Sequence, residues 1–165
     1  MGAHRYLVAL GSNVRHHRHG RPEQVLRSAL AELAGEGLIV ERVSRIHTSA
    51  PLGPSRRRYA NAAAVLGTSL EPEELLAVLQ RIECGFGRRR GGQQWRARVL
   101  DLDIVLWDGG AYAAGGLIVP HPEFRSRDFV LRLAVDVAAD WRDPITGLTI
   151  RQLVSRLTRP RPAPR

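Results

Sequence analysis

Hydrophobic residues recur along the chain at two spacings, which together predict strands alternating with helices. Runs of alternating or consecutive apolar residues predict strands over 6–10, 38–46, 59–70, 99–107 and 117–119. Apolar residues three or four positions apart predict helices that begin at Pro22, Pro72 and Asp128, with a last short helix over 150–157. Proline suits the first turn of a helix and aspartate suits its cap, which supports these starting points.

The order of these elements is βαββαβ, followed by a C-terminal extension of helix and hairpin. This order resembles the ferredoxin-like sandwich of the α+β class, in which helices pack on one face of a mainly antiparallel sheet. We expect a single domain over residues 1–158. Residues 159–165 (RPRPAPR) lack the apolar side chains of a core, so we expect a flexible tail there.

The size and composition fit one globular domain: 165 residues, of which 44% are hydrophobic. Cys84 is the single cysteine, which excludes an internal disulfide and fits a reducing compartment. The start of the chain becomes polar too soon for a signal peptide, and the apolar runs are too short to span a membrane. We therefore expect a cytoplasmic protein without a membrane partner.

The basic residues of the chain exclude two classes of nucleotide-binding enzyme. The net charge is +9, and all 25 basic side chains are arginine because the chain contains no lysine. P-loop enzymes and protein kinases each need a lysine at the phosphates, so both classes are excluded. Arginine can still bind phosphate oxygens in pairs. A basic balance would also fit nucleic acid or a membrane surface.

The Asp101-Leu102-Asp103 segment is the sharpest chemical feature. On a strand, residues two apart point to the same face, so the two carboxylates stand about 6.5–7 Å apart at Cα. Two neighbouring ionised carboxylates repel and call for a cation between them, and oxygen ligands of this kind suit Mg²⁺. The alternative is that one carboxylate pairs with Arg98 while the other is solvated.

An arginine-rich segment lies just before this strand. It contains one tryptophan and several glycines, and its arginines are Arg88, Arg89, Arg90, Arg96 and Arg98. A metal site beside several guanidinium groups could stabilise a transferring phosphoryl group, and the glycines would let the segment close as a lid. The alternative is a solvated loop that binds a nucleic-acid backbone, with Trp95 stacking on bases.

Four segments, in order, resemble the 6-hydroxymethyl-7,8-dihydropterin pyrophosphokinase family. They are 10–13 (LGSN), 51–54 (PLGP) with 59–62 (YANA), 81–104 (RIECGFGRRRGGQQWRARVLDLDI), and 119–122 (VPHP) with 127–129 (RDF). Together they span about residues 6–135. The resemblance implies transfer of diphosphate from ATP to the pterin hydroxymethyl group, with release of AMP, in folate biosynthesis.

The resemblance also implies roles for individual residues. Asp101 and Asp103 would hold two Mg²⁺ ions, with Arg88 and Arg98 as catalytic phosphate contacts. The ATP side would consist of Glu83, Arg90, Trp95, Arg98, Ile104, His121 and Arg127. The pterin side would consist of Ser49, Ala50, Leu52, Tyr59, Asn61, Trp95 and Phe129. The expected partners are therefore small molecules, with no nucleic acid, and the expected state is a monomer.

The chain departs from the family pattern at several positions. These are Gly91, Arg96-Ala97, Ser49-Ala50, Gly116 and Ile118. They affect the predicted loop dynamics and nucleotide affinity more than the predicted chemistry.

Two other functions fit parts of the sequence. An arginine-rich RNA-binding module would bind without Mg²⁺, but aromatic residues make up only 5% of the chain and form no clear pair on one strand. A Mg²⁺-dependent nucleotidyl transferase would release pyrophosphate instead of AMP.

Overall fold

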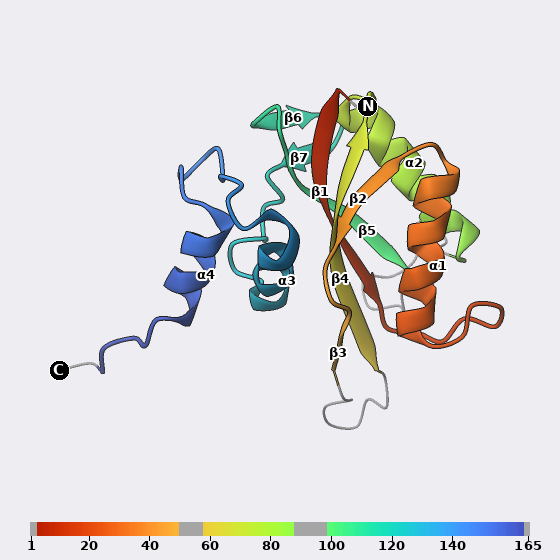
Figure 1. The fold of residues 1–165 in the computed structure, drawn as a ribbon, viewed down its shortest axis with the longest axis horizontal. Coiled ribbons are helices and arrows are strands. Elements are labelled where there is room, and N and C mark those ends of the chain that lie inside the picture. The colour runs from red at the N-terminus through yellow and green to blue at the C-terminus, as the bar shows by residue number, and fades with distance from the viewer. Residues whose placement is uncertain (1–2, 50–57, 88–98, 164–165) are drawn as a thin grey trace.

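A central antiparallel sheet organises the computed structural model, which describes residues 3–49, 58–87 and 99–163. The strands are β1 (His4–Ser12), β2 (Ile39–Val43), β3 (His47–Ser49), β4 (Tyr59–Thr68), β5 (Asp101–Trp107), β6 (Tyr112–Ala114) and β7 (Leu117–Val119). The helices are α1 (Pro22–Gly35), α2 (Pro72–Gly85), α3 (Asp128–Ala138) and α4 (Ile150–Thr158). The predicted βαββαβ order is confirmed, and Figure 1 shows the elements in place.

The sheet order is β2-β4-β1-β5, with β3 also paired to β4. All of these pairings are antiparallel. β6 and β7 form a separate hairpin, of which the sequence predicted only the second strand. The predicted strand over 38–46 is instead two shorter strands, β2 and β3.

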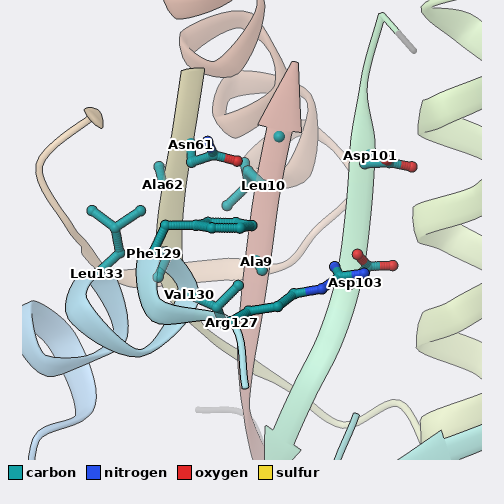
Figure 2. Close-up of a pocket in the computed structure, with 12 residues that line it drawn as sticks. Ala9, Leu10, Asn61, Ala62, Asp101, Asp103, Arg127, Phe129, Val130 and Leu133 are labelled. Carbon is teal, nitrogen blue, oxygen red and sulfur yellow. The ribbon is translucent and has the colours of Figure 1, made fainter. Parts of the chain in front are cut away.

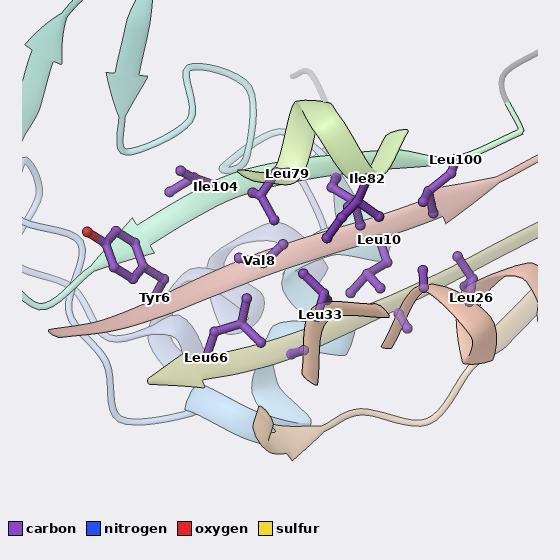
Figure 3. Close-up of a cluster of buried hydrophobic side chains, with 14 of the residues drawn as sticks. Tyr6, Val8, Leu10, Leu26, Leu33, Leu66, Leu79, Ile82, Leu100 and Ile104 are labelled. Carbon is purple, nitrogen blue, oxygen red and sulfur yellow. The ribbon is translucent and has the colours of Figure 1, made fainter. Parts of the chain in front are cut away.

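Helices α1 and α2 cover one face of the sheet. Their apolar residues at helical spacing pack against alternate residues of β1, including Tyr6, Val8 and Leu10. Figure 3 shows this first core. In α2, Pro72 stands in the first turn and a capping box joins Glu71 to Glu74, which is why the helix begins there.

The C-terminal extension covers the opposite face, where α3 packs and α4 packs against α3 (Figure 1). The side chains of this second core come from the other set of alternating strand residues and from α3, α4 and the segment before α3; they include Leu7, Val65, Val105, Phe124, Leu131 and Val137. The sheet is therefore buried on both faces over much of its length.

A bulge in β5 separates the two ends of this strand. The β1–β5 register shifts between Leu7, opposite Leu106, and Val8, opposite Ile104. Val105 and Leu106 both join the second core as a result, because the extra residue breaks the alternation. Before the bulge, Asp101 and Asp103 lie on the same face as Val105.

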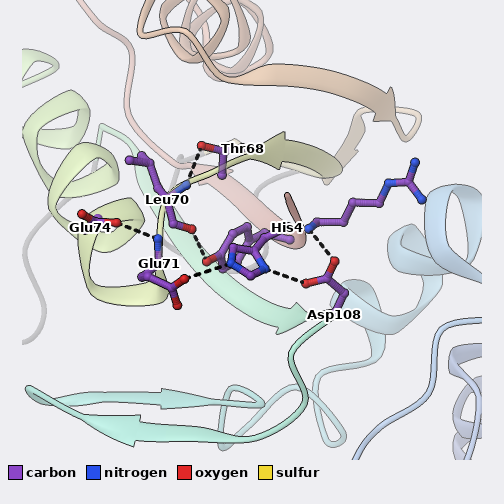
Figure 4. Close-up of polar contacts among 8 residues, drawn as sticks. His4, Thr68, Leu70, Glu71, Glu74 and Asp108 are labelled. Atoms are coloured by element: carbon purple, nitrogen blue, oxygen red, sulfur yellow. Dashed lines mark hydrogen bonds and ion pairs between the residues drawn. The ribbon is translucent and has the colours of Figure 1, made fainter. Parts of the chain in front are cut away.

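Polar contacts tie the start of β1 to its neighbours, as Figure 4 shows. His4 Nε2 lies 3.0 Å from Glu71 Oε1, and His4 Nδ1 lies 3.5 Å from Asp108 Oδ1. The hydrogen bond with Glu71 and the two carboxylate charges raise the pKa of His4. The Tyr6 hydroxyl donates to the carbonyl oxygen of Leu70 at 2.6 Å, and burial raises the pKa of Tyr6.

Across the described ranges, every helix is either too short or too polar to cross a bilayer.

Candidate active site

The β5 strand places Asp101 and Asp103 side by side on the α3 face of the sheet, and both are half-buried. Leu102, between them, points the other way and is only 2% exposed in the first core. The same-face placement predicted from the sequence is therefore confirmed. The two carboxylates reach a solvent-accessible surface while their strand is held by buried neighbours.

The antiparallel register extends this polar face across three strands. Asp101 lies opposite Gly11 of β1, and Gly11 lies opposite Asn61 of β4. Asp103 likewise lies opposite Ala9. A Cβ added at Gly11 would lie 3.2 Å from the Asn61 side-chain oxygen, so the glycine gives this amide its room.

A cleft of about 120 Å³ opens over this face. Its lining residues come from β1, β4, β5, α3 and the position just before α3. They are Ala9, Leu10, Gly11, Asn61, Ala62, Ala63, Asp101, Asp103, Arg127, Phe129, Val130 and Leu133. A second hollow of about 130 Å³ shares Gly11, Asn61 and Asp101 with the first and extends to Tyr59. The two hollows therefore form one continuous depression at the carboxylate end of the sheet.

The start of α3 forms the wall opposite the carboxylates. Figure 2 shows the Phe129 ring and the Arg127 side chain projecting from this helix end, with Arg127 extending toward Asp103. Phe129 is 41% exposed, so part of its ring is available to a ligand. Arg127 also forms an ion pair with Glu123, one turn earlier in the chain.

Glu83 lies behind β5 and does not line either hollow. It is 4% exposed, and its Oε1 accepts a hydrogen bond of 3.0 Å from the Leu102 amide. Ile104, also predicted for the ATP side, is 3% exposed, and its side chain packs in the first core. His121 accepts a hydrogen bond at Nδ1 from the Glu123 amide and lies outside both hollows.

On the predicted pterin side, the structure brings Tyr59, Asn61 and Phe129 to the depression. Ser49 pairs with Tyr59 where β3 meets β4. The remaining predicted residues lie outside the described part of the chain; they are Ala50, Leu52, Arg88, Arg90, Trp95 and Arg98.

The small residues of the floor were not predicted as site residues. Ala9 and Ala63 face the cleft because they continue the register of Gly11 and Asn61 by two positions. Gly11 stood in a motif that the sequence singled out, but only the pairing of β1 with β4 and β5 reveals what it faces. Leu133 and Val130, both on α3, complete the wall of the cleft.

The donor set fits a hard divalent cation bound together with a phosphate ligand. Among the described residues, no group of three or more His, Cys, Asp or Glu side chains converges as a self-sufficient metal site. Asp101 and Asp103 offer carboxylate oxygens into one open cleft. Mg²⁺ is commonly held in this way, by one or two carboxylates, water and substrate phosphates.

Two curated relatives match this chain over most of its length. A pyrophosphokinase of 2-amino-4-hydroxy-6-hydroxymethyldihydropteridine from Synechocystis is 39% identical over 155 residues, covering 93% of this chain and 76% of the relative. The enzyme of the same name from Pseudomonas aeruginosa is 40% identical over 143 residues, covering 85% of this chain and 84% of the relative.

Solved structures share the fold at low sequence identity. The wild-type HPPK-DHPS of Plasmodium falciparum superposes with a TM-score of 0.70 and 13% identity, over 93% of this chain and 41% of that one. An HPPK-DHPS in complex with substrates gives a TM-score of 0.71 and 10% identity, over 94% of this chain and 43% of that one. The chain thus spans less than half of these longer proteins, and the ferredoxin-like α+β fold is confirmed.

The family model for 7,8-dihydro-6-hydroxymethylpterin-pyrophosphokinase matches residues 7–139, which include most of β1, all of β4 and β5, and every residue that lines the two hollows. The chain belongs to the 7,8-dihydro-6-hydroxymethylpterin-pyrophosphokinase family.

Proposed function

We propose that this protein transfers a diphosphoryl group from ATP to the hydroxymethyl group of 6-hydroxymethyl-7,8-dihydropterin and releases AMP, as a step of folate biosynthesis. The observation that carries the proposal is the pairing of Asp101 and Asp103 in one cleft that also presents Asn61 and Phe129, in a chain of this family. The first pair suits a metal-bound polyphosphate, and the second suits a flat polar heterocycle.

On the nucleotide side, Asp101 and Asp103 would hold two Mg²⁺ ions. The ions, when bound, would neutralise negative charge on the ATP phosphates. Arg127, which stands immediately before α3 and extends toward Asp103, can add a guanidinium contact to the same phosphates. Arg88, Arg90 and Arg98 are predicted to contact the phosphates as well. The chain contains no lysine, so arginine must take the place that lysine has in other phosphate sites.

On the pterin side, the Asn61 amide offers a donor and an acceptor that match the amide edge of the ring. Phe129 offers an exposed ring for stacking. Ala9, Gly11 and Ala63 leave space for a flat ligand because their side chains are small. Ser49, Ala50, Leu52, Tyr59 and Trp95 are predicted to complete this side.

The main contribution of the protein to this reaction is to align the two substrates. The pterin hydroxyl oxygen forms a bond to the β-phosphorus of ATP, the bond from that phosphorus to the α,β-bridging oxygen breaks, and AMP leaves with the bridging oxygen. The hydroxyl proton is lost to a base or to water. Holding both substrates in one depression lowers the barrier by proximity and orientation. We further propose that the protein acts as a cytoplasmic monomer with a single domain over residues 1–158.

The test is product analysis with hydroxymethyl-dihydropterin, ATP and Mg²⁺. We expect AMP and the pterin diphosphate in equal amounts, and no AMP when either the pterin or Mg²⁺ is omitted. Release of pyrophosphate in place of AMP would instead indicate a nucleotidyl transferase, and absence of both products would refute the proposal.

A further inference from the structure

β5, the strand that carries the two cleft carboxylates, is an edge strand of the sheet. In the sheet, β5 pairs with β1, which is its only strand neighbour in the described part of the chain. The Leu102 amide is not used by that pairing and donates instead to Glu83. This amide belongs to the peptide bond between Asp101 and Leu102, and Leu102 is the residue that stands between the two aspartates.

Glu83 is an unusual residue to find in this position. It stands in the last turn of α2 and is 4% exposed, and a carboxylate at such a depth is costly unless it is hydrogen-bonded or paired. Its hydrogen bond from the Leu102 amide is 3.0 Å long and buried. A buried hydrogen bond of this length holds its donor in place, so the contact can resist rotation of the peptide between Asp101 and Leu102.

We propose that Glu83 is a positioning residue that fixes the Leu102 peptide and thereby sets the relative placement of the Asp101 and Asp103 carboxylates for divalent cations. The role differs from the direct ATP contact implied by the family resemblance. It also ties β5 to the end of α2, the helix that runs in sequence into the arginine-rich segment. The metal part of the inference rests on the proposed function.

Three substitutions separate hydrogen bonding from charge. Glu83→Gln keeps a side-chain oxygen at the same reach and removes the charge. Glu83→Asp keeps the charge and shortens the reach, and Glu83→Ala removes both. Ile82→Val is the matched control, because Ile82 is 5% exposed in the same helical turn and faces the first core.

Two measurements test the proposal without requiring catalytic turnover. Hydrogen exchange of the Leu102 amide, read by NMR, reports the contact itself. Mn²⁺ affinity in the presence of α,β-methylene-ATP, read by electron paramagnetic resonance, reports the metal site. We expect Ala and Asp to speed exchange and weaken Mn²⁺ binding by about tenfold or more, as outer-shell substitutions at metal sites do. Gln should stay within about threefold of wild type, and Ile82→Val should leave Mn²⁺ affinity unchanged.

Other outcomes overturn the proposal. Normal Mn²⁺ affinity in Glu83→Ala, with or without faster exchange, would show that the contact does not position the carboxylates. Affinity lost equally in Gln and Ala would show that the charge of Glu83 matters and not its hydrogen bond. If Glu83→Ala does not fold, Glu83→Asp supplies the same comparison. A wild-type protein that binds no Mn²⁺ would overturn the proposed function and the metal part of this inference together, whereas the preceding outcomes overturn the inference alone.

Discussion

Asp143 is a buried acid whose replacement should cost the fold a measurable, pH-dependent free energy. Its side chain is fully buried and accepts hydrogen bonds from Arg125 at 2.5 and 2.7 Å, from the Ile145 amide, and from the Thr146 hydroxyl. Burial alone would raise the pKa of Asp143, but the hydrogen bonds and the Arg125 charge outweigh burial and lower the pKa to about 2.

The lowered pKa of Asp143 gives the size of the expected effect on the free energy of unfolding. A fall from 3.8 to about 2 is roughly 1.8 pH units, and at 1.36 kcal/mol per unit it contributes about 2.4 kcal/mol to the free energy of unfolding at pH 7. The folded pKa is the lower one, so this stabilisation is complete above about pH 5 and is lost as the pH falls. About half of it should remain at pH 3.

The assay is urea unfolding of wild type and Asp143→Asn at pH 7, 5 and 3. Asparagine has nearly the same shape, so the difference in unfolding free energy reports the charge. We expect about 2 kcal/mol at pH 7 and 5 and roughly half of that at pH 3. Asp140→Asn is the control, because its 3.5 Å pair with Arg151 is exposed and should contribute under about 1 kcal/mol. A difference for Asp143→Asn that does not change with pH would refute the reasoning.

Three further predictions concern the site and the far end of β1. Asp103→Ala should lower the rate of AMP formation by at least about a hundredfold while the thermal midpoint stays close to wild type, because the residue is half-buried and lies at the cleft; a normal rate would contradict the metal assignment. Phe129→Ala should raise the KM for the pterin by about two- to tenfold and leave that for ATP unchanged, because ring stacking contributes about 0.5–1.5 kcal/mol; equal changes in both constants would contradict the pterin role. His4→Ala should destabilise the protein most below about pH 6.5, because Glu71 raises the pKa of His4, and the difference in thermal midpoint should shrink as the pH rises through that raised pKa; a difference that grows with pH would contradict this sign.

Periodicity could predict the elements because each helix and strand buries a regular subset of its own residues. The helix beginning at Pro72 and the strand carrying Asp101 and Asp103 follow from local spacing alone. The first strand of the β6–β7 hairpin was not predicted, because Tyr112–Ala114 has three residues and little apolar alternation. The break between β2 and β3 depends on how each pairs with β4, which no local pattern contains.

The candidate site was predictable where one strand carries the chemistry and unpredictable where several strands meet. The Asp-Leu-Asp alternation sufficed to place both carboxylates on one face. The alignment of Asn61, Gly11 and Asp101 needed the register of three strands that are far apart in sequence. The role of Glu83 needed a contact between a helix and a free strand edge. Helical spacing from Leu75 and Leu79 places Glu83 on the buried side of α2, but it does not reveal which group the carboxylate contacts.

The two halves of the α3 face explain how one sheet can hold both a core and a cleft. Beneath the later part of α3, the strands present large apolar residues such as Leu7 and Val65, which fill the space under the helix. Beneath its first turn, the same strands present Ala9 and Gly11, which do not fill it. The helix is therefore anchored by packing at one end while Phe129 borders an open depression at the other. Since Arg125 precedes this first turn and is held by Asp143, the C-terminal extension supports the wall of the site as well as the core beneath it.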